Sequence, residues 1–358
     1  MKIVDLRPPV ERWAQRVWHG EPTAHPGAWS RLWGGIVARR LAGRAAPAVS
    51  PFILSVGNLS LGGSGKTPVA GKLALDLARG GLKIGVLTRG YRSRRKGPVL
   101  VDAGCDECGD EARLLARMLA AVGVPVVQAA DRSAGLNFLT ARFSDLDCVI
   151  VEDGFQTRGV GRHLDILILD AWDSDAQGRV RPLAGPVVPL GPWREPASAA
   201  DRAGIWLLET PAAPKLPAPP GHHVTTFSRT CRLVSAADQQ EAKSLDRPWA
   251  SLAGIARPEA LERDAGSLAG VPPVAAVRCR DHEPYRQSQI REIARHLDEV
   301  GVHAVVTTEK DWVKLEGRVP ASWKVFLVVQ TVNWAGQADA LPKLVRKRVR
   351  RHAEGVRD

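Results

Sequence analysis

Residues 55–68, SVGNLSLGGSGKTP, contain the residue types of a phosphate-binding loop. An apolar run at residues 52–56 is followed by a glycine-rich turn, and then by the start of an amphipathic stretch at residues 69–77. Glycines let successive backbone N–H groups converge on phosphate oxygens, a lysine reaches the β- and γ-phosphates, and a threonine hydroxyl can ligate Mg²⁺. The predicted nucleotide-binding residues are Gly62, Gly63, Ser64, Gly65, Lys66 and Thr67.

The spacing of this loop departs from the common G-x-x-x-x-G-K-[ST] pattern. That pattern requires glycine at position 60, where this chain has Ser60, and the glycines lie closer to Lys66 instead. A glycine-rich turn can also occur without a ligand. The strand predicted before it and the helix predicted after it favour phosphate binding.

A second apolar strand, predicted at residues 148–151, ends in Glu152 and Asp153. In phosphate-loop enzymes a carboxylate at such a strand end binds Mg²⁺ directly or through water. We therefore predict Asp153 as a metal ligand. The alternative is an acid that only caps the backbone of the following turn.

Gly109, Asp110 and Glu111 begin a helix predicted at residues 111–119. Acids are common there because they complement the helix dipole and cap free N–H groups. Phosphoryl transfer to a hydroxyl also needs a carboxylate that orients or deprotonates that hydroxyl, and Asp110 would suit this role. From the residues alone, capping is the stronger interpretation.

Two polar clusters follow later in the chain. His282 lies between Asp281 and Glu283, and a histidine flanked by acids can act as a proton carrier, although a lone histidine is more often structural. Residues 307–311, TTEKD, follow a predicted strand, at the end where ligands bind in α/β sheets.

The apolar runs that position these residues alternate with helical stretches, which is typical of a doubly wound, mostly parallel sheet. The strands predicted after the loop cover residues 84–87, 125–128, 148–151, 166–169 and 205–208.

A proline-rich stretch at residues 211–220 interrupts this pattern and is predicted to be a linker or an exposed loop. Beyond it, a second, smaller α/β domain is predicted, with a helix at residues 289–300. Its strands are predicted at residues 249–253, 274–277, 304–307 and 325–329. The predicted segments are therefore 1–46, an N-terminal amphipathic segment; 47–225, the phosphate-loop domain; and 226–358, the smaller domain with a basic tail.

The chain has 358 residues and a formal net charge of +12, and 44% of its residues are hydrophobic, as in a globular protein. Only two tyrosines and six phenylalanines occur, and they do not alternate with basic residues, so no nucleic-acid partner is expected. No apolar run reaches the roughly 18 residues of a membrane-spanning helix. Because residues 1–13 also lack the apolar core of a secretory signal, we expect the chain to stay in the cytoplasm.

The positive charge is concentrated beside two apolar faces, which favours an anionic membrane surface as a partner. From Trp29 to Leu41 apolar residues recur at helical spacing with arginines around them, and residues 343–351, KLVRKRVRR, are also rich in cations. The first helix could equally pack on the core of the protein. Among the five cysteines, Cys105 and Cys108 form a CxxC without a second pair, so neither a zinc site nor a disulfide framework is predicted.

The motifs together resemble those of the tetraacyldisaccharide 4′-kinases of lipid A biosynthesis, in the same order and over nearly the whole chain. They are GNLSLGGSGKTP, LTRGY at Leu87, GDE at Gly109, DR at Asp131, EDGFQ at Glu152, WREP at Trp193, GIARPE at Gly254, DHEPY at Asp281 and TTEKD at Thr307. The resemblance implies transfer of the ATP γ-phosphate to the 4′-hydroxyl of a tetraacyldisaccharide 1-phosphate, which forms lipid IVA.

The resemblance also implies residue roles. Asp110 and His282 would act as a catalytic dyad with Lys66. The Mg²⁺ ligands would be Thr67, Asp153, Glu195 and Glu111. Arginine binds phosphate in a bidentate manner, so the predicted phosphate anchors are Arg89, Arg132 and Arg194. A peripheral monomer on the cytoplasmic face of the bacterial inner membrane is expected, with the lipid A precursor and the anionic membrane surface as partners.

Two positions depart from the family pattern. Glu152 stands where the family usually has aspartate, and Thr157 where it has histidine, which leaves the role of Glu152 open. Two other functions remain as alternatives: a phosphate-loop ATPase or ligase with a soluble substrate, and a non-catalytic nucleotide-binding membrane adaptor.

Overall fold

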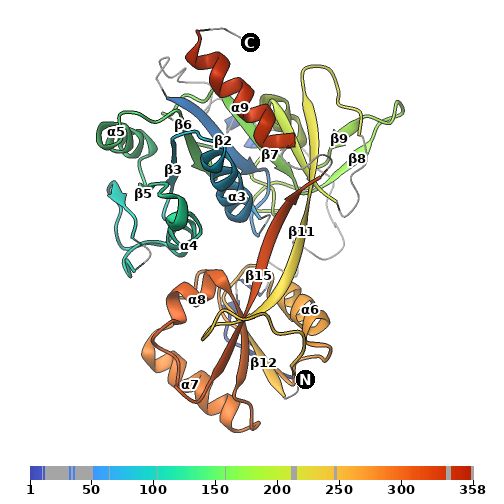
Figure 1. Ribbon diagram of the computed structural model, residues 1–358. Helices are drawn as coiled ribbons and strands as arrows, with labels where there is room; N and C mark the ends of the chain where they lie inside the picture. Colours follow the sequence, from blue (N-terminus) through green and yellow to red (C-terminus); the bar gives the residue numbers. More distant parts are fainter. Residues whose placement is uncertain are drawn as a thin grey trace. The chain divides into compact units, whose positions relative to one another are not determined.

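The structure is a computed structural model, and its chain divides into two compact units (Figure 1). It describes residues 1–9, 11–12, 32–33, 35–36, 51–63, 65–102, 104–157, 159–210, 216–245, 248–335 and 340–355. The phosphate-loop unit comprises Trp18–Arg229 and Val332–Asp358, and the smaller unit comprises Met1–Val17 and Thr230–Thr331.

The sheet of the phosphate-loop unit has the strand order β11-β10-β7-β2-β6-β3-β5-β4. All paired neighbours from β11 to β5 are parallel, and β4 is antiparallel to β5. The strands are β2 (Phe52–Asn58), β3 (Ile84–Thr88), β4 (Val99–Leu100), β5 (Val126–Gln128), β6 (Cys148–Glu152), β7 (Leu164–Leu169), β10 (Ile205–Glu209) and β11 (His223–Ser235).

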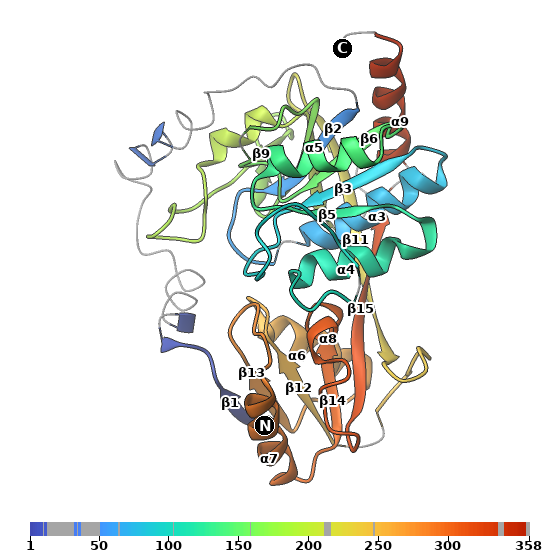
Figure 2. The same cartoon turned by 90° about the vertical axis from the view of Figure 1, so that its left-hand side faces the viewer.

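Helices cover both faces of this sheet, as expected for a doubly wound fold. Alternate residues of β2 enter different cores: Leu54 packs with α3 (Lys66–Arg79), α4 (Asp110–Leu119) and α9 (Ala340–Ala353), whereas Ile53 packs in the core that includes α5 (Arg132–Arg142). Figure 1 shows α3 and α9 in front of the sheet, and Figure 2 shows α5. All seven residues of β2 are buried, so the loop that follows it starts from a rigid strand.

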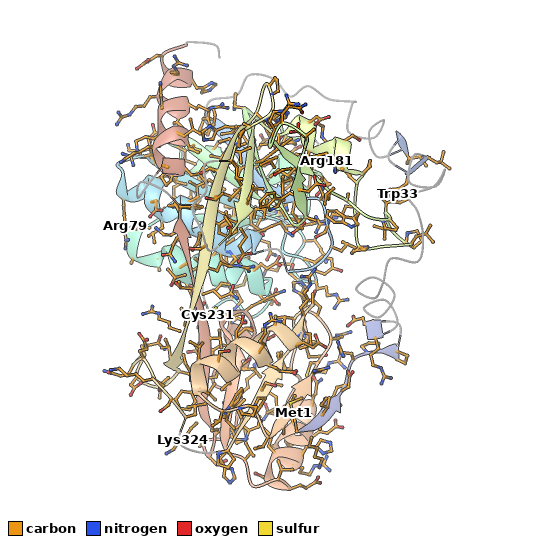
Figure 3. The ribbon with its side chains drawn as sticks, turned by 90° about the vertical axis from the view of Figure 1, so that its right-hand side faces the viewer. Met1, Trp33, Arg79, Arg181, Cys231 and Lys324 are labelled. Carbon is orange, nitrogen blue, oxygen red and sulfur yellow. A yellow bond between two sulfur atoms is a disulfide. The ribbon has the colours of Figure 1, made fainter. Side chains whose placement is uncertain are left out.

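Two smaller elements complete the phosphate-loop unit. The hairpin of β8 (Trp172–Ser174) and β9 (Val180–Pro182) forms a separate two-stranded sheet, in which Arg181 donates to Asp173 at 2.8 Å (Figure 3). A 3₁₀ helix, η2 (Ala197–Arg202), packs its buried alanines beside Leu167 and Leu208.

The smaller unit contains a parallel sheet in the order β1-β13-β12-β14-β15. Its strands are β1 (Lys2–Asp5), β12 (Trp249–Ala253), β13 (Ala275–Arg278), β14 (Ala304–Thr308) and β15 (Lys324–Trp334). Helix α6 (Pro258–Ala269) packs on one side in the core around Trp249, whereas α7 (Gln287–Asp298) and the end of α8 (Glu309–Leu315) pack in the core around Leu252.

The predicted fold class is confirmed. Each predicted strand is present, and most of the observed first and last residues differ from the predicted ones by no more than a few residues. The units are divided differently from the predicted segments. Lys2–Asp5 pairs with Ala275–Arg278, so the N-terminal residues belong to the smaller unit. The basic C-terminal segment forms α9, whose Leu341, Val345 and Val349 are buried in the core of the phosphate-loop unit.

The predicted N-terminal amphipathic helix, Trp29 to Leu41, lies mostly outside the described residues. Residues 32–33 and 35–36 are helical, with Leu32 and Ile36 exposed and the Trp33 indole donating to the Arg194 carbonyl at 3.2 Å (Figure 3). Within the described residues, none of the helices has both the length and the apolar character needed to cross a bilayer.

Candidate active site

The loop between β2 and α3 has the conformation that a phosphate-binding turn requires. Gly65 caps α3 with a φ of 77°, a left-handed value that side-chain-bearing residues avoid. A Cβ at this position would also lie 3.1 Å from Nη1 of Arg229. The backbone therefore turns into the first N–H groups of α3, where the helix dipole favours an anion. The predicted Ser64 lies outside the described residues.

Lys66 extends from this turn toward the ends of the central strands. Its Nζ donates to Oδ1 of Asn58 at 3.0 Å and lies 3.7 Å from Oδ1 of Asp153. Asn58 in turn donates to Ser60 and to Asp170. Asn58 is not among the residues predicted from the sequence; the signal for it is a polar residue at the last position of a fully buried strand.

Glu152 is the carboxylate that contacts the threonine of the loop. Its Oε1 accepts from Thr67 Oγ1 at 2.9 Å and its Oε2 accepts from Thr88 Oγ1 at 2.8 Å, and only 1% of the residue is exposed. Burial raises the pKa of Glu152 to about 7, and the negative charges of Glu111 and Asp153 act in the same direction. The carboxylates of Glu111 and Asp153 thus both repel that of Glu152.

Asp153 faces the cations. Its carboxylate accepts from Arg194 Nη1 at 2.8 and 3.0 Å, and its φ of 50° turns the chain away from the direction of β6. Burial acts to raise the pKa of Asp153, but the positive charges of Lys66 and Arg194 outweigh it and lower that pKa. Asp153 therefore stays ionised while its neighbour Glu152 does so less readily.

Arg132 is buried behind the end of β6. Its Nη1 donates to the Ala129 carbonyl at 2.8 Å and its Nη2 to the Glu152 carbonyl at 3.3 Å, while Nε has no hydrogen-bond partner among the described residues. Burial lowers the pKa of Arg132 to about 10, partly offset by the charges of Glu152 and Asp153. Arg89 is exposed, and its charge acts on Arg132.

Asp110 is the first residue of α4 and is 5% exposed. Its Oδ1 accepts from the N–H of Glu111 at 3.0 Å. The preceding residue is fixed by Gln128, whose Oε1 accepts from the Gly109 N–H at 2.7 Å and whose Nε2 donates to Ser93 at 2.9 Å. Gln128 was also not selected from the sequence, although it too is a buried polar residue at a strand end.

Glu195 is engaged by other side chains. Arg202 donates to both of its oxygens at 2.8 and 2.9 Å, and Gln156 donates to it at 3.0 Å. Its assignment as a metal ligand stays a prediction. In the described part of the chain, no group of three His, Cys, Asp or Glu side chains is arranged to hold a metal ion by itself.

His282 lies in the smaller unit, and Asp110 in the phosphate-loop unit. The His282 backbone has a φ of 59°, and its N–H donates to the Gly254 carbonyl at 3.0 Å. Its Nε2 lies 3.2 Å from Lys310 Nζ and 3.8 Å from Asp281. The pairing of His282 with Asp110 stays a prediction.

The CxxC is paired in this structure: Cys105 and Cys108 form a disulfide with their Cα atoms 5.4 Å apart. The three remaining cysteines have free thiols.

Comparison with known proteins gives a consistent result. Residues 28–350 match the family model described as tetraacyldisaccharide-1-P 4′-kinase. The tetraacyldisaccharide 4′-kinase of Gluconacetobacter diazotrophicus is 32% identical over 90% of this chain and 94% of its own, and that of Caulobacter vibrioides is 33% identical over 84% of each. The crystal structure of LpxK from Aquifex aeolicus in complex with ATP has a TM-score of 0.64 and 26% identity, covering 89% of this chain and 96% of that chain.

Proposed function

We propose a catalytic mechanism for this chain from the premise that it belongs to the tetraacyldisaccharide 4′-kinase family of lipid A biosynthesis. It is an ATP-dependent kinase whose acceptor is the 4′-hydroxyl of a tetraacyldisaccharide 1-phosphate. The observation that carries the mechanism is the convergence of Lys66 and Thr67, at the start of α3, with Glu152 and Asp153, at the end of the adjacent parallel strand β6.

The loop and α3 hold the phosphates of ATP. The backbone N–H groups that follow Gly65 and the Lys66 ammonium donate to the β- and γ-phosphate oxygens. Asn58 and Asp153 hold the lysine at this position. Arg89, Arg132 and Arg194 add positive charge for the phosphates of ATP or of the acceptor.

The donor set fits Mg²⁺, which prefers oxygen ligands and uses one or two carboxylates together with substrate phosphates. The Thr67 hydroxyl, Glu152, Asp153 and Glu111 would hold it, and the raised pKa of Glu152 supports this assignment because a cation relieves repulsion among carboxylates. When bound, the ion neutralises charge on the transferring phosphoryl group. Glu195, engaged with Arg202, would be a ligand only after breaking that pair.

Asp110 accepts the proton of the acceptor's 4′-hydroxyl. The hydroxyl oxygen bonds to the γ-phosphorus of ATP, and the bond between this phosphorus and the oxygen that leaves with ADP breaks. The geometry that supports this role is the rigid attachment of Asp110, whose neighbour Gly109 is tied to the buried Gln128. His282 assists by orienting or relaying that proton.

Attachment to the cytoplasmic face of the inner membrane would occur through the helix predicted at residues 29–41. The exposed side chains of Leu32 and Ile36 support it. Helix α9 adds exposed cations opposite its buried face; they are Lys343, Lys347, Arg350 and Arg351. Since residues 2–5 form β1 of the smaller unit, the test is L32E with I36E instead of truncation. Unchanged sedimentation of this variant with anionic vesicles would refute the attachment.

The experiment that tests the kinase mechanism is transfer of labelled γ-phosphate from Mg·ATP to tetraacyldisaccharide 1-phosphate in mixed micelles. We expect labelled lipid from the wild type and severe losses in K66A, D110A and H282A. Full transfer by D110A would rule out its role as the base, and absence of labelled lipid from the wild type would favour a soluble-substrate ATPase.

A further inference from the structure

The TTEKD segment, residues 307–311, joins β14 to α8 and surrounds a fully buried carboxylate. Asp311 is 0% exposed, and its Oδ2 accepts from the Gly254 N–H and from Thr308 Oγ1, both at 3.0 Å. Its Oδ1 has no hydrogen-bond partner among the described residues and lies 3.2 Å from Lys314 Nζ, whose charge offsets that of the carboxylate. Because a buried charge is costly unless it is paired, the hydrogen bonds of Oδ2 and this ion pair fix Asp311 in one position.

The peptide groups of Gly254 connect Asp311 to the backbone of His282. The Gly254 N–H donates to Asp311, and the Gly254 carbonyl accepts from the His282 N–H at 3.0 Å. No side chain fits at position 254, since a Cβ there would lie 2.8 Å from Tyr285 Oη and 3.0 Å from Asp311 Oδ1. The glycine of GIARPE therefore allows the loop of DHEPY to approach the carboxylate of TTEKD.

The His282 loop needs such an anchor. His282 and Tyr285 have φ values of 59° and 50°, left-handed conformations that side-chain-bearing residues keep only where the surrounding structure imposes them. Tyr285 is fully buried, with Lys314 Nζ 5.3 Å from its ring centroid. The loop is thus held in a strained conformation at both residues.

Lys310 contacts the imidazole of His282 directly. Its Nζ lies 3.2 Å from His282 Nε2 and 3.4 Å from Asp281 Oδ1. An ammonium group has donors only, so Nε2 is the acceptor and a neutral ring carries its proton on Nδ1. The His282 side chain is 9% exposed, which leaves few other orientations for the ring.

We propose that Lys310 and Asp311 are positioning residues for His282. Asp311 fixes the backbone of the loop through Gly254, and Lys310 fixes the orientation and the tautomer of the imidazole. Neither residue needs to touch ATP or the acceptor. The proposal rests on the proposed role of His282, and it accounts for a motif to which the phosphoryl-transfer mechanism gives no task.

A double-mutant cycle tests whether Lys310 acts through His282. Misplacing a catalytic group by about 1 Å can lower the rate by about 100-fold, so we expect K310M to lower kcat by about 10- to 100-fold with little change in the KM for ATP. In the H282A background the same change should have almost no further effect. K310R should recover part of the activity, and K324M, which alters an exposed lysine of the same unit, should match the wild type. An equal loss from K310M in both backgrounds would overturn the proposal.

A measurement independent of activity separates this proposal from the proposed function. Ring ¹⁵N resonances of His282 in the full-length protein should show the Nδ1–H tautomer, and K310M should shift the population toward Nε2–H. The His282 amide should exchange with solvent faster in D311A. If H282A is fully active, the proposed catalytic role of His282 is wrong, but these resonances still test whether Lys310 positions the ring. An unchanged tautomer population in K310M would overturn the proposal that Lys310 positions His282, whether or not D311A folds.

Discussion

Replacing Glu152 with glutamine should stabilise the ATP-free protein at alkaline pH while it impairs catalysis. Burial and two neighbouring carboxylates raise the pKa of Glu152 from 4.5 to about 7. Since one pKa unit corresponds to about 1.4 kcal/mol, this rise corresponds to about 3 kcal/mol. The glutamine keeps the shape of the side chain, and the hydroxyls of Thr67 and Thr88 can rotate to meet its amide.

Proton linkage determines the direction in which the free energy of unfolding changes with pH. A carboxyl group whose pKa is higher in the folded state binds its proton more tightly there, so its contribution is fully favourable below pH 4.5 and is lost as the pH rises through about 7. The free energy of unfolding of the wild type should therefore fall, relative to that of E152Q, by up to about 3 kcal/mol between pH 4.5 and pH 8.

Urea unfolding of both proteins at several pH values, without nucleotide or metal, measures this difference. E241Q, at an exposed glutamate, is the matched control and should follow the wild type at each pH. Adding Mg·ATP should favour the wild type over E152Q. Identical pH dependence of unfolding in the wild type and E152Q would refute the electrostatic reasoning at this site.

Three further predictions concern the same unit. G65A should weaken ATP binding about tenfold, because a left-handed conformation costs a side-chain-bearing residue roughly 1–2 kcal/mol; G97A, at an exposed glycine outside the loop where a Cβ would meet nothing within 4 Å, should bind ATP normally in the same calorimetric titration. Q128L should lower the free energy of unfolding by about 1–3 kcal/mol, since it leaves a buried N–H of the helix start unsatisfied, and should lower kcat as well; wild-type kcat in Q128L would contradict its role. R194A should move the acid limb of the pH–rate profile to higher pH, because Arg194 helps to lower the pKa of Asp153; an unmoved limb would show that the pair does not govern activity.

The parts of the fold that the sequence predicts are those with a local signal. β2, β6 and β12 are fully buried, mostly apolar strands, and their observed first residues are those where the apolar runs of the sequence begin. The phosphate loop was also predictable, because its glycines, lysine and threonine are contiguous. A motif made of adjacent residues can be recognised without knowing how the rest of the chain folds.

Long-range pairing explains what was missed. β1 is only four residues long and becomes a strand by pairing with β13, more than 270 residues later. The basic composition of α9 suggested a surface tail, yet its three aliphatic residues at intervals of four are enough to bury one face on the sheet. Asn58 accepts from Lys66 and Gln128 accepts from the Gly109 N–H, and nothing in the sequence indicates either contact.

The two acids at the end of β6 show the same limit. Sequence reasoning selected Asp153 and left Glu152 open, because either could follow the strand. In the structure both acids approach the loop: Glu152, the last residue in strand conformation, contacts Thr67, and Asp153, after the turn, lies 3.7 Å from Lys66 and binds Arg194. Which loop residue each acid contacts depends on a single backbone turn, which the residue types do not specify.

As a lipid kinase, this chain must couple ATP cleavage to phosphorylation of a lipid hydroxyl. Measuring ADP and phosphorylated lipid in the same reaction, with and without tetraacyldisaccharide 1-phosphate, tests this coupling directly. One phosphorylated lipid should form for each ADP, and almost no ADP should form without acceptor. ADP that forms equally fast without acceptor, with no phosphate in the lipid, would contradict it.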